Sequence, residues 1–214
     1  MSAIEQFSSE LDIDELIASL SIKQQSPEGL FFPDTYSYTQ SDSVTDVLNV
    51  AYAKMNKILA DEWKLRAPDL PYDTPYEALI MASIIEKETG LISERSDISG
   101  VFMRRLKLGM RLQTDPTVIY GLGRNFDGDL KRSDLKNYSS YNTYMINGLP
   151  PTPIAMPSSG AIRAALHPGK GSSLYFVARG DGGHYFSDTL EEHSRAVKRF
   201  QIDKRAKNYQ SSPN

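Results

Sequence analysis

The sequence predicts an α+β fold: a helical core around a buried glutamate-bearing helix, with long ordered loops and a small antiparallel hairpin. Apolar residues recur with helical spacing in several segments between Ser43 and Leu108. Two short segments of strand-forming residues flank a glycine-rich turn nearer the C-terminus. Runs of helices with a few strands are typical of this class. The 214 residues, 40% of them hydrophobic, are enough for one core and a small appendage.

The composition argues against several classes of protein. A net charge of -3 disfavours a dedicated nucleic-acid binder, which is usually basic. The absence of cysteine rules out disulfides, thiolate nucleophiles and cysteine-based zinc sites. No apolar run reaches the roughly 18 residues typical of a membrane-spanning helix, and no signal peptide is visible.

The N-terminal part is predicted to lead into the main domain. Residues 1–27 contain a short helix, Asp12–Leu20, and a polar link, and we expect them to be the end of a preceding region. Residues 28–39 mix aromatic and turn residues, which predicts a short strand. Ser43–Trp63 has helical periodicity. The main domain is expected over residues 28–208.

The next helix carries clear signals at both ends. Thr74 is the expected N-cap, Pro75 occupies the first helical position, and Glu77 completes a capping box. Gly90 is expected to end the helix. Apolar residues occupy most of its faces, so the helix is predicted to be buried.

The elements that follow are read from periodicity and turn residues. Glu94–Leu108 is predicted to be a helix ended by Gly109, and residues 110–157 to be mostly ordered loop. Ser159–Leu166 is predicted to be a short helix. The predicted C-terminal elements are a hairpin of Leu174–Arg179 and His184–Ser187 around Gly180–Gly183, a helix from Thr189 to about Lys207, and a frayed tail at residues 209–214.

Glu86 is the first candidate for chemistry because it lies in the helix predicted to be buried. Burial raises the pKa of a carboxyl group and so favours the protonated form that a general acid needs. The residues alone leave a second interpretation open, in which Glu86 is a core glutamate paired with an arginine. Glu88 points to another face, and we expect it to be structural, paired with Arg95 or Arg104.

Two polar segments are candidates for a binding groove. Amides, hydroxyls and aromatic rings together suit a sugar, although they also fix loops. The candidate groove residues are Gln113, Asp115 and Thr117, around a proline turn, and Tyr141, Asn142 and Tyr144. The three histidines are too widely spaced for a known zinc motif and are expected to be structural. No metal site or cofactor is predicted.

Several motifs occur in order and carry a family resemblance. They are EGLFFPDTY at 28–36, ASIIEKET at 82–89, RLQTDPTVIYG at 111–121, YNTY at 141–144 and GLPP at 148–151. Over about residues 28–205 the chain strongly resembles the endolytic murein transglycosylase family, also called MltG or YceG-like.

The resemblance implies a lyase of the bacterial cell envelope. Such enzymes cut the β-1,4 bond after N-acetylmuramic acid within peptidoglycan glycan strands and leave 1,6-anhydromuramoyl ends. Family members are usually anchored at the periplasmic face of the inner membrane by an N-terminal helix that precedes a LysM-like region. That helix is not visible in this sequence, and residues 1–27 are expected to be a remnant of the LysM-like region. Peptidoglycan glycan strands are the implied partner, with peptidoglycan synthases as candidate protein partners.

The resemblance also implies roles for residues. The family's catalytic glutamate is assigned to Glu86, acting first as acid and then as base. Glu94 and Arg95 are expected to orient the site, and the six candidate residues given above are expected to form the groove. The alternatives are a muramidase-type hydrolase and a non-catalytic glycan-binding module.

Overall fold

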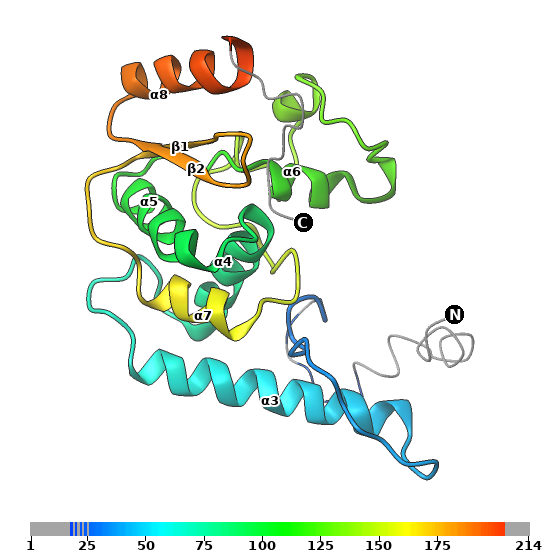
Figure 1. Cartoon of the computed structure of the whole chain (residues 1–214). Coiled ribbons are helices and arrows are strands. Elements are labelled where there is room, and N and C mark those ends of the chain that lie inside the picture. The colour runs from blue at the N-terminus through cyan, green and yellow to red at the C-terminus, as the bar shows by residue number, and fades with distance from the viewer. Residues whose placement is uncertain (1–17, 19, 21, 23, 25, 204–214) are drawn as a thin grey trace.

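The computed structural model describes residues 18, 20, 22, 24 and 26–203 (Figure 1). Its helices are α3 (Val44–Lys64), α4 (Pro75–Glu88), α5 (Arg95–Lys107), α6 (Asp115–Leu122), α7 (Ser159–Leu166) and α8 (Leu190–Val197). Its strands are β1 (Tyr175–Ala178) and β2 (His184–Ser187). Short turns of other helix types are η1 (Ile92–Glu94), η2 (Gly123–Asn125), η3 (Asp134–Lys136) and η4 (Lys198–Asp203). The predicted α+β class is confirmed.

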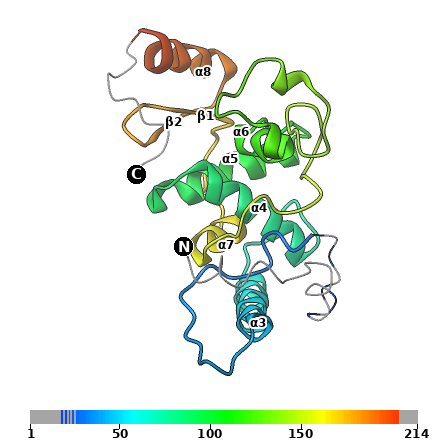
Figure 2. The same ribbon diagram turned by 90° about the vertical axis from the view of Figure 1, so that its right-hand side faces the viewer.

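Helix α4 forms the centre of the core. Eight consecutive residues, from Ala78 to Ile85, are buried in it. Helices α3, α5, α6 and α7 all contact α4, and α7 packs along it most extensively. Figure 2 shows α3 nearly end-on at one end of the molecule, with α8 and the hairpin at the other end. Because side chains on every face of α4 are enclosed, α4 is a fixed frame for residues at its end.

The start of α4 was predicted correctly, and the helix stops just before the predicted stop residue Gly90. Thr74 caps the helix and Glu77 completes the capping box, with Pro75 in the first turn. The last helical residue is Glu88, because Thr89 has an extended backbone with φ of -143°. The chain therefore leaves the helix before Gly90.

The strand predicted over residues 28–39 is wrong. The described backbone there forms turns and irregular structure. The buried side chains of Leu30 and Phe31 account for its apolar character, and the Phe32 amide donates to the Ala51 carbonyl of α3 at 3.1 Å. Burial against a helix gives the same apolar pattern as a strand without any partner strand.

Helix α6 lies where the sequence was expected to be mostly loop. Thr114, in an extended conformation, precedes the helix, and Pro116 lies in its first turn. Proline is compatible with that position because the first amide groups of a helix have no partner within the helix. The turn predicted at Pro116 is therefore wrong, and Pro116 belongs to the first turn of α6.

The C-terminal part forms a hairpin covered by a helix. The predicted hairpin is confirmed: strands β1 and β2 pair antiparallel, and Tyr175 lies opposite Ser187 and Ala178 opposite His184. Helix α8 packs on both strands (Figure 1). It ends at Val197 and continues as the π-helical turn η4, and residues 204–207 of the predicted longer helix lie outside the described residues.

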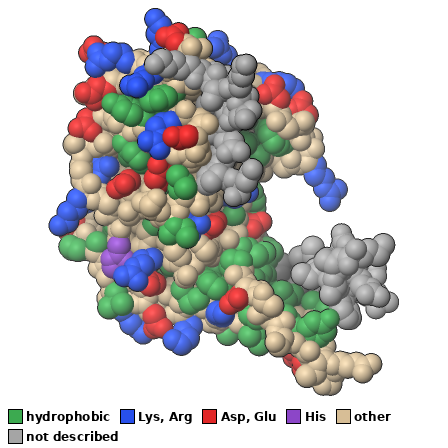
Figure 3. Space-filling view, in the orientation of Figure 1, with side chains coloured by type: hydrophobic (Ala, Val, Ile, Leu, Met, Phe, Trp, Pro, Cys, Tyr) green, Lys and Arg blue, Asp and Glu red, His purple; other side chains and the backbone are tan. Residues whose placement is uncertain are grey.

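The expected helix at Asp12–Leu20 falls almost wholly outside the described residues, as does the predicted tail at 209–214. No helix in the described part of the chain has both the length and the apolar character needed to cross a membrane. Figure 3 shows acidic and basic side chains interspersed over the face that it displays.

Candidate active site

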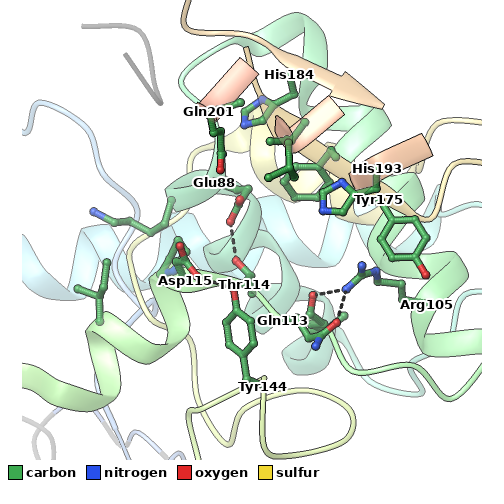
Figure 4. A pocket seen from close by; sticks show the side chains of 18 of the residues that line it. Glu88, Arg105, Gln113, Thr114, Asp115, Tyr144, Tyr175, His184, His193 and Gln201 are labelled. Atoms are coloured by element: carbon green, nitrogen blue, oxygen red, sulfur yellow. Dashed lines mark hydrogen bonds between the residues drawn. The ribbon is translucent and has the colours of Figure 1, made fainter. Parts of the chain in front are cut away.

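A pocket of about 660 Å³ lies where the end of α4, the start of α6, the hairpin and the C-terminal helices meet (Figure 4). Its lining mixes polar and apolar side chains. Residues far apart in sequence supply it, including Glu88, Gln113, Tyr144 and His184. The pocket therefore depends on tertiary packing and not on one local motif.

Glu88 is a partly buried carboxyl group on the wall of this pocket. It is the last residue of α4, and the Thr114 hydroxyl donates a hydrogen bond of 2.5 Å to its Oε2 atom. Burial raises the pKa of the Glu88 carboxyl to about 7, although the bond from Thr114 opposes the shift. The nearby charge of Asp115 raises the pKa of Glu88 further. Near neutral pH this carboxyl group can hold a proton or release it.

The start of α6 lies beside Glu88 in the pocket. Gln113 has a left-handed backbone, with φ of +53°, and its amide donates to the Thr143 carbonyl at 3.1 Å. Asp115 accepts a hydrogen bond of 2.6 Å from the Tyr144 hydroxyl. Burial raises the pKa of the Tyr144 hydroxyl above its ordinary value, and the bond to Asp115 adds to this effect. Tyr144 therefore stays a donor that fixes the Asp115 carboxylate.

His184 is a pocket residue that the sequence reasoning missed. Its Nδ1 atom lies 2.8 Å from Oε2 of Glu94, and its backbone amide donates to Oε1 of the same carboxylate at 3.0 Å. Glu94 thus ties the start of β2 to the turn η1, and it fixes the histidine ring with the Nε2 edge turned away from Glu94. His184 was expected to be structural because the three histidines are too widely spaced to form a motif in the sequence.

Glu86 lies outside the residues that line this pocket and is paired with an arginine. Its Oε1 atom accepts from Arg95 at 2.9 Å. Its Oε2 atom accepts from the backbone amide of Ser158 at 2.9 Å and from the Ser158 hydroxyl at 2.6 Å. Ser158 also caps α7. This group holds the end of α4, the start of α5 and the start of α7 together, which is the core-pair interpretation that the residues left open.

The expectation that Glu88 pairs with Arg95 or Arg104 is also wrong. Arg95 is bound to Glu86 and Ser158, and Arg104 donates to the carbonyls of Ser173 and Gly169. The sequence could not show this, because Ser158 lies 72 residues from Glu86 along the chain.

Three of the six candidate groove residues line the pocket, namely Gln113, Asp115 and Tyr144. The other three support the loops behind it. The Thr117 hydroxyl donates to the Thr114 carbonyl at 2.8 Å, and the Tyr141 hydroxyl lies 2.8 Å from that of Thr152.

Asn142 is the most thoroughly bonded of the supporting residues. Its Nδ2 atom donates to the carbonyls of Asn137 at 2.7 Å and Asp134 at 3.1 Å, and its Oδ1 atom accepts from the Tyr144 amide at 2.9 Å. The side chain is 1% exposed. Asn142 therefore places Tyr144 and does not face the pocket itself.

In the described part of the chain, no three histidine, aspartate or glutamate side chains are grouped as metal ligands would be.

A sequence model of the YceG-like family matches residues 2–199. The chain belongs to the YceG-like family. The YceG-like chain is 38% identical over 180 residues to the endolytic murein transglycosylase of Bacillus subtilis, a match that covers 84% of this chain and 49% of that protein. It is 33% identical over 192 residues to the endolytic murein transglycosylase of Streptococcus pneumoniae, covering 85% of this chain and 34% of that protein.

A solved structure agrees with this assignment. The crystal structure of a YceG-like protein from Listeria monocytogenes superposes with a TM-score of 0.71 at 35% identity, covering 85% of this chain and 62% of that one. The family resemblance inferred from the motifs is confirmed. The chain spans about half the length of the Bacillus relative and about a third of the Streptococcus relative.

Proposed function

We propose that this YceG-like chain is the catalytic part of an endolytic murein transglycosylase. It cleaves the β-1,4 bond between N-acetylmuramic acid and N-acetylglucosamine within peptidoglycan strands and leaves 1,6-anhydromuramoyl ends. The observation that carries the proposal is the Glu88 carboxyl, bound by the Thr114 hydroxyl on the wall of the pocket, where burial raises its pKa to about 7. Relatives that bear the name of this activity support the choice of substrate.

Glu88, in place of Glu86, is the proposed acid. Because Oε2 of Glu88 accepts the hydrogen bond from Thr114, Oε1 is the atom left to carry the proton. Glu88 donates this proton to the glycosidic oxygen as the bond to the muramoyl C1 atom breaks. Positive charge then develops at C1, as in other glycoside cleavages.

The same carboxylate completes the reaction as a base. It takes the proton of the muramoyl C6 hydroxyl, whose oxygen attacks C1 and closes the anhydro ring. One proton leaves Glu88 and one returns, so no water is consumed and the reaction is that of a lyase. A single carboxyl group with a pKa near the working pH suffices for both steps.

Asp115 is the proposed electrostatic partner. Its charge favours the protonated form of Glu88 before cleavage. During cleavage a carboxylate fixed by Tyr144 stabilises the positive charge that develops at the sugar. Glu94 is proposed to position His184 on the same pocket, whereas Arg95 acts through the packing of α4, α5 and α7.

The proposed function also implies a cellular location and partners for the enzyme. It works in the bacterial cell envelope on glycan strands, at the periplasmic face of the inner membrane, with peptidoglycan synthases as protein partners. Residues 1–27 are proposed to be the end of a LysM-like region that precedes the catalytic domain.

Mass spectrometry of a digest of murein sacculi made in water enriched in ¹⁸O tests the proposal. We expect new 1,6-anhydromuramoyl ends without ¹⁸O. Reducing ends that carry ¹⁸O would instead show a muramidase-type hydrolase, and no new ends would show a glycan-binding module.

A further inference from the structure

We infer that Arg105 forms a carboxylate-binding corner in the pocket, which recognises the negative charge that peptidoglycan strands carry beside the bond to be cut. This inference rests on the proposed function. The carboxylate can come from the lactyl group of an N-acetylmuramic acid without a stem peptide, or from a stem peptide. Both sources present the same chemical group to the protein.

The Arg105 guanidinium is held in a fixed orientation by neutral acceptors. The side chain is 7% exposed and belongs to α5. Its Nε atom donates to the Leu174 carbonyl at 2.7 Å, and one terminal nitrogen donates to the carbonyls of Leu112 at 2.9 Å and Arg111 at 3.1 Å. These acceptors fix the guanidinium, but none of them supplies a negative charge to balance it.

No carboxylate compensates this charge among the described residues. Their ion pairs within 4.0 Å do not include Arg105. Burial lowers the pKa of Arg105, which shows that the charged form is held at a cost in solvation. Arginine nevertheless remains charged in proteins, so a ligand carboxylate would relieve that cost and gain hydrogen bonds.

His193 lies at the same corner and has a ring nitrogen that is free to bind a ligand. His193 stacks on Tyr175 with ring centroids 5.2 Å apart, and the Arg105 guanidinium lies 5.0 Å from the Tyr175 ring centre. The Nδ1 atom of His193 is buried and has no hydrogen-bond partner among the described residues. All three side chains line the pocket.

The corner is separate from the acid groups of the pocket. Figure 4 shows Arg105, Tyr175 and His193 together on the side of the pocket away from Asp115. One side of the pocket therefore carries the Glu88 and Asp115 carboxyl groups next to the exposed Lys87, and the other side carries a buried, fixed positive charge. A glycan strand with a carboxylate on one side of the scissile bond would be oriented by this difference.

Binding measured on the full chain with Glu88→Gln, which should not cleave the probe, tests the inference. The first pair of probes is a tetrasaccharide of alternating N-acetylglucosamine and N-acetylmuramic acid with free lactyl carboxylates, and the same sugar with lactyl methylamides. The second pair carries stem peptides with free or amidated carboxylates. We expect the charged member of at least one pair to bind about tenfold more tightly, the usual scale for a hydrogen bond to a charged group. The pair that shows the difference identifies the source.

Arg105→Gln, combined with Glu88→Gln, provides the matched variant, since the glutamine amide nitrogen reaches about as far as Nε and can still donate to the Leu174 carbonyl. We expect it to abolish the preference for the charged probe and to leave binding of the neutral probe unchanged. Arg105→Lys should restore part of the preference because it keeps the charge without the planar fork. Thermal unfolding of each variant checks the fold.

Equal binding of charged and neutral probes in both pairs would overturn the inference, whatever the fate of the Arg105 variants. If the wild-type chain still produced anhydro ends, only this inference would fail. Absence of both cleavage and binding would overturn it together with the proposed function.

Discussion

Glu86 and Glu88 leave the end of α4 in different directions, because residues two apart on a helix differ by about 200° around its axis. One direction leads to Arg95 and Ser158, and the other leads to Thr114 and the pocket. The sequence indicated an energetically unusual carboxyl on this helix, but its neighbours come from segments folded against it. Which of the two glutamates faces the pocket could therefore not be read from periodicity.

The pH dependence of cleavage follows from the raised pKa of Glu88. Because the proposed acid must be protonated, the rate constant at saturating glycan should fall by about tenfold per pH unit above a pH of about 7. The measurement is the initial rate of anhydro-end release between pH 5 and pH 9. A rate that stays level up to pH 9 would contradict this role.

Stability should also depend on pH through Glu88. The pKa is raised in the folded state from the usual 4.5 to about 7, so deprotonation opposes folding. The free energy of unfolding of the wild-type chain should therefore fall, relative to Glu88→Gln, as pH rises from about 4.5 to about 7, by on the order of 1 to 3 kcal/mol. Denaturant unfolding of both proteins at several pH values measures this difference. A constant difference would show that the pKa is not shifted.

At the scale of elements, local signals predicted what depends on local chemistry. Thr74 and Glu77 define the start of α4, and the glycines at 180–183 define the hairpin, since caps and turns are satisfied within a few residues. The prediction of a strand at 28–39 failed because a strand needs a partner strand, which no local pattern reveals. Helix α6 was missed because Asp115-Pro116 fits both a turn and a first helical turn.

The loop that follows α6 offers a test at this scale. Asn142→Ala should lower the free energy of unfolding by about 2 kcal/mol, because several buried backbone groups lose their partner. Since Asn142 places Tyr144, we also expect slower cleavage, with Tyr144→Phe giving a similar loss without comparable destabilisation. If Asn142→Ala weakened glycan binding with no loss of stability, Asn142 would be a groove residue as first predicted.

At the scale of the whole molecule, the pocket exists because the buried helix α4 fixes the positions of α5, α6 and α7 around it. Glu88, Asp115, Arg105 and His184 come from four separate elements, so no single motif contains the site. The family resemblance found in the motifs pointed to this region of the chain. The proposal that Glu88 is the acid rests on the packed structure.

The most direct test compares Glu88→Gln with Glu86→Gln on purified murein sacculi, well below the unfolding temperature of either variant. Release of 1,6-anhydromuropeptides is measured by liquid chromatography and mass spectrometry. We predict that Glu88→Gln keeps its fold and releases none, whereas Glu86→Gln is less stable by about 2 kcal/mol, since its pair with Arg95 is weakened, and still releases them. Release by a folded Glu88→Gln variant, or its loss from a folded Glu86→Gln variant alone, would contradict the account.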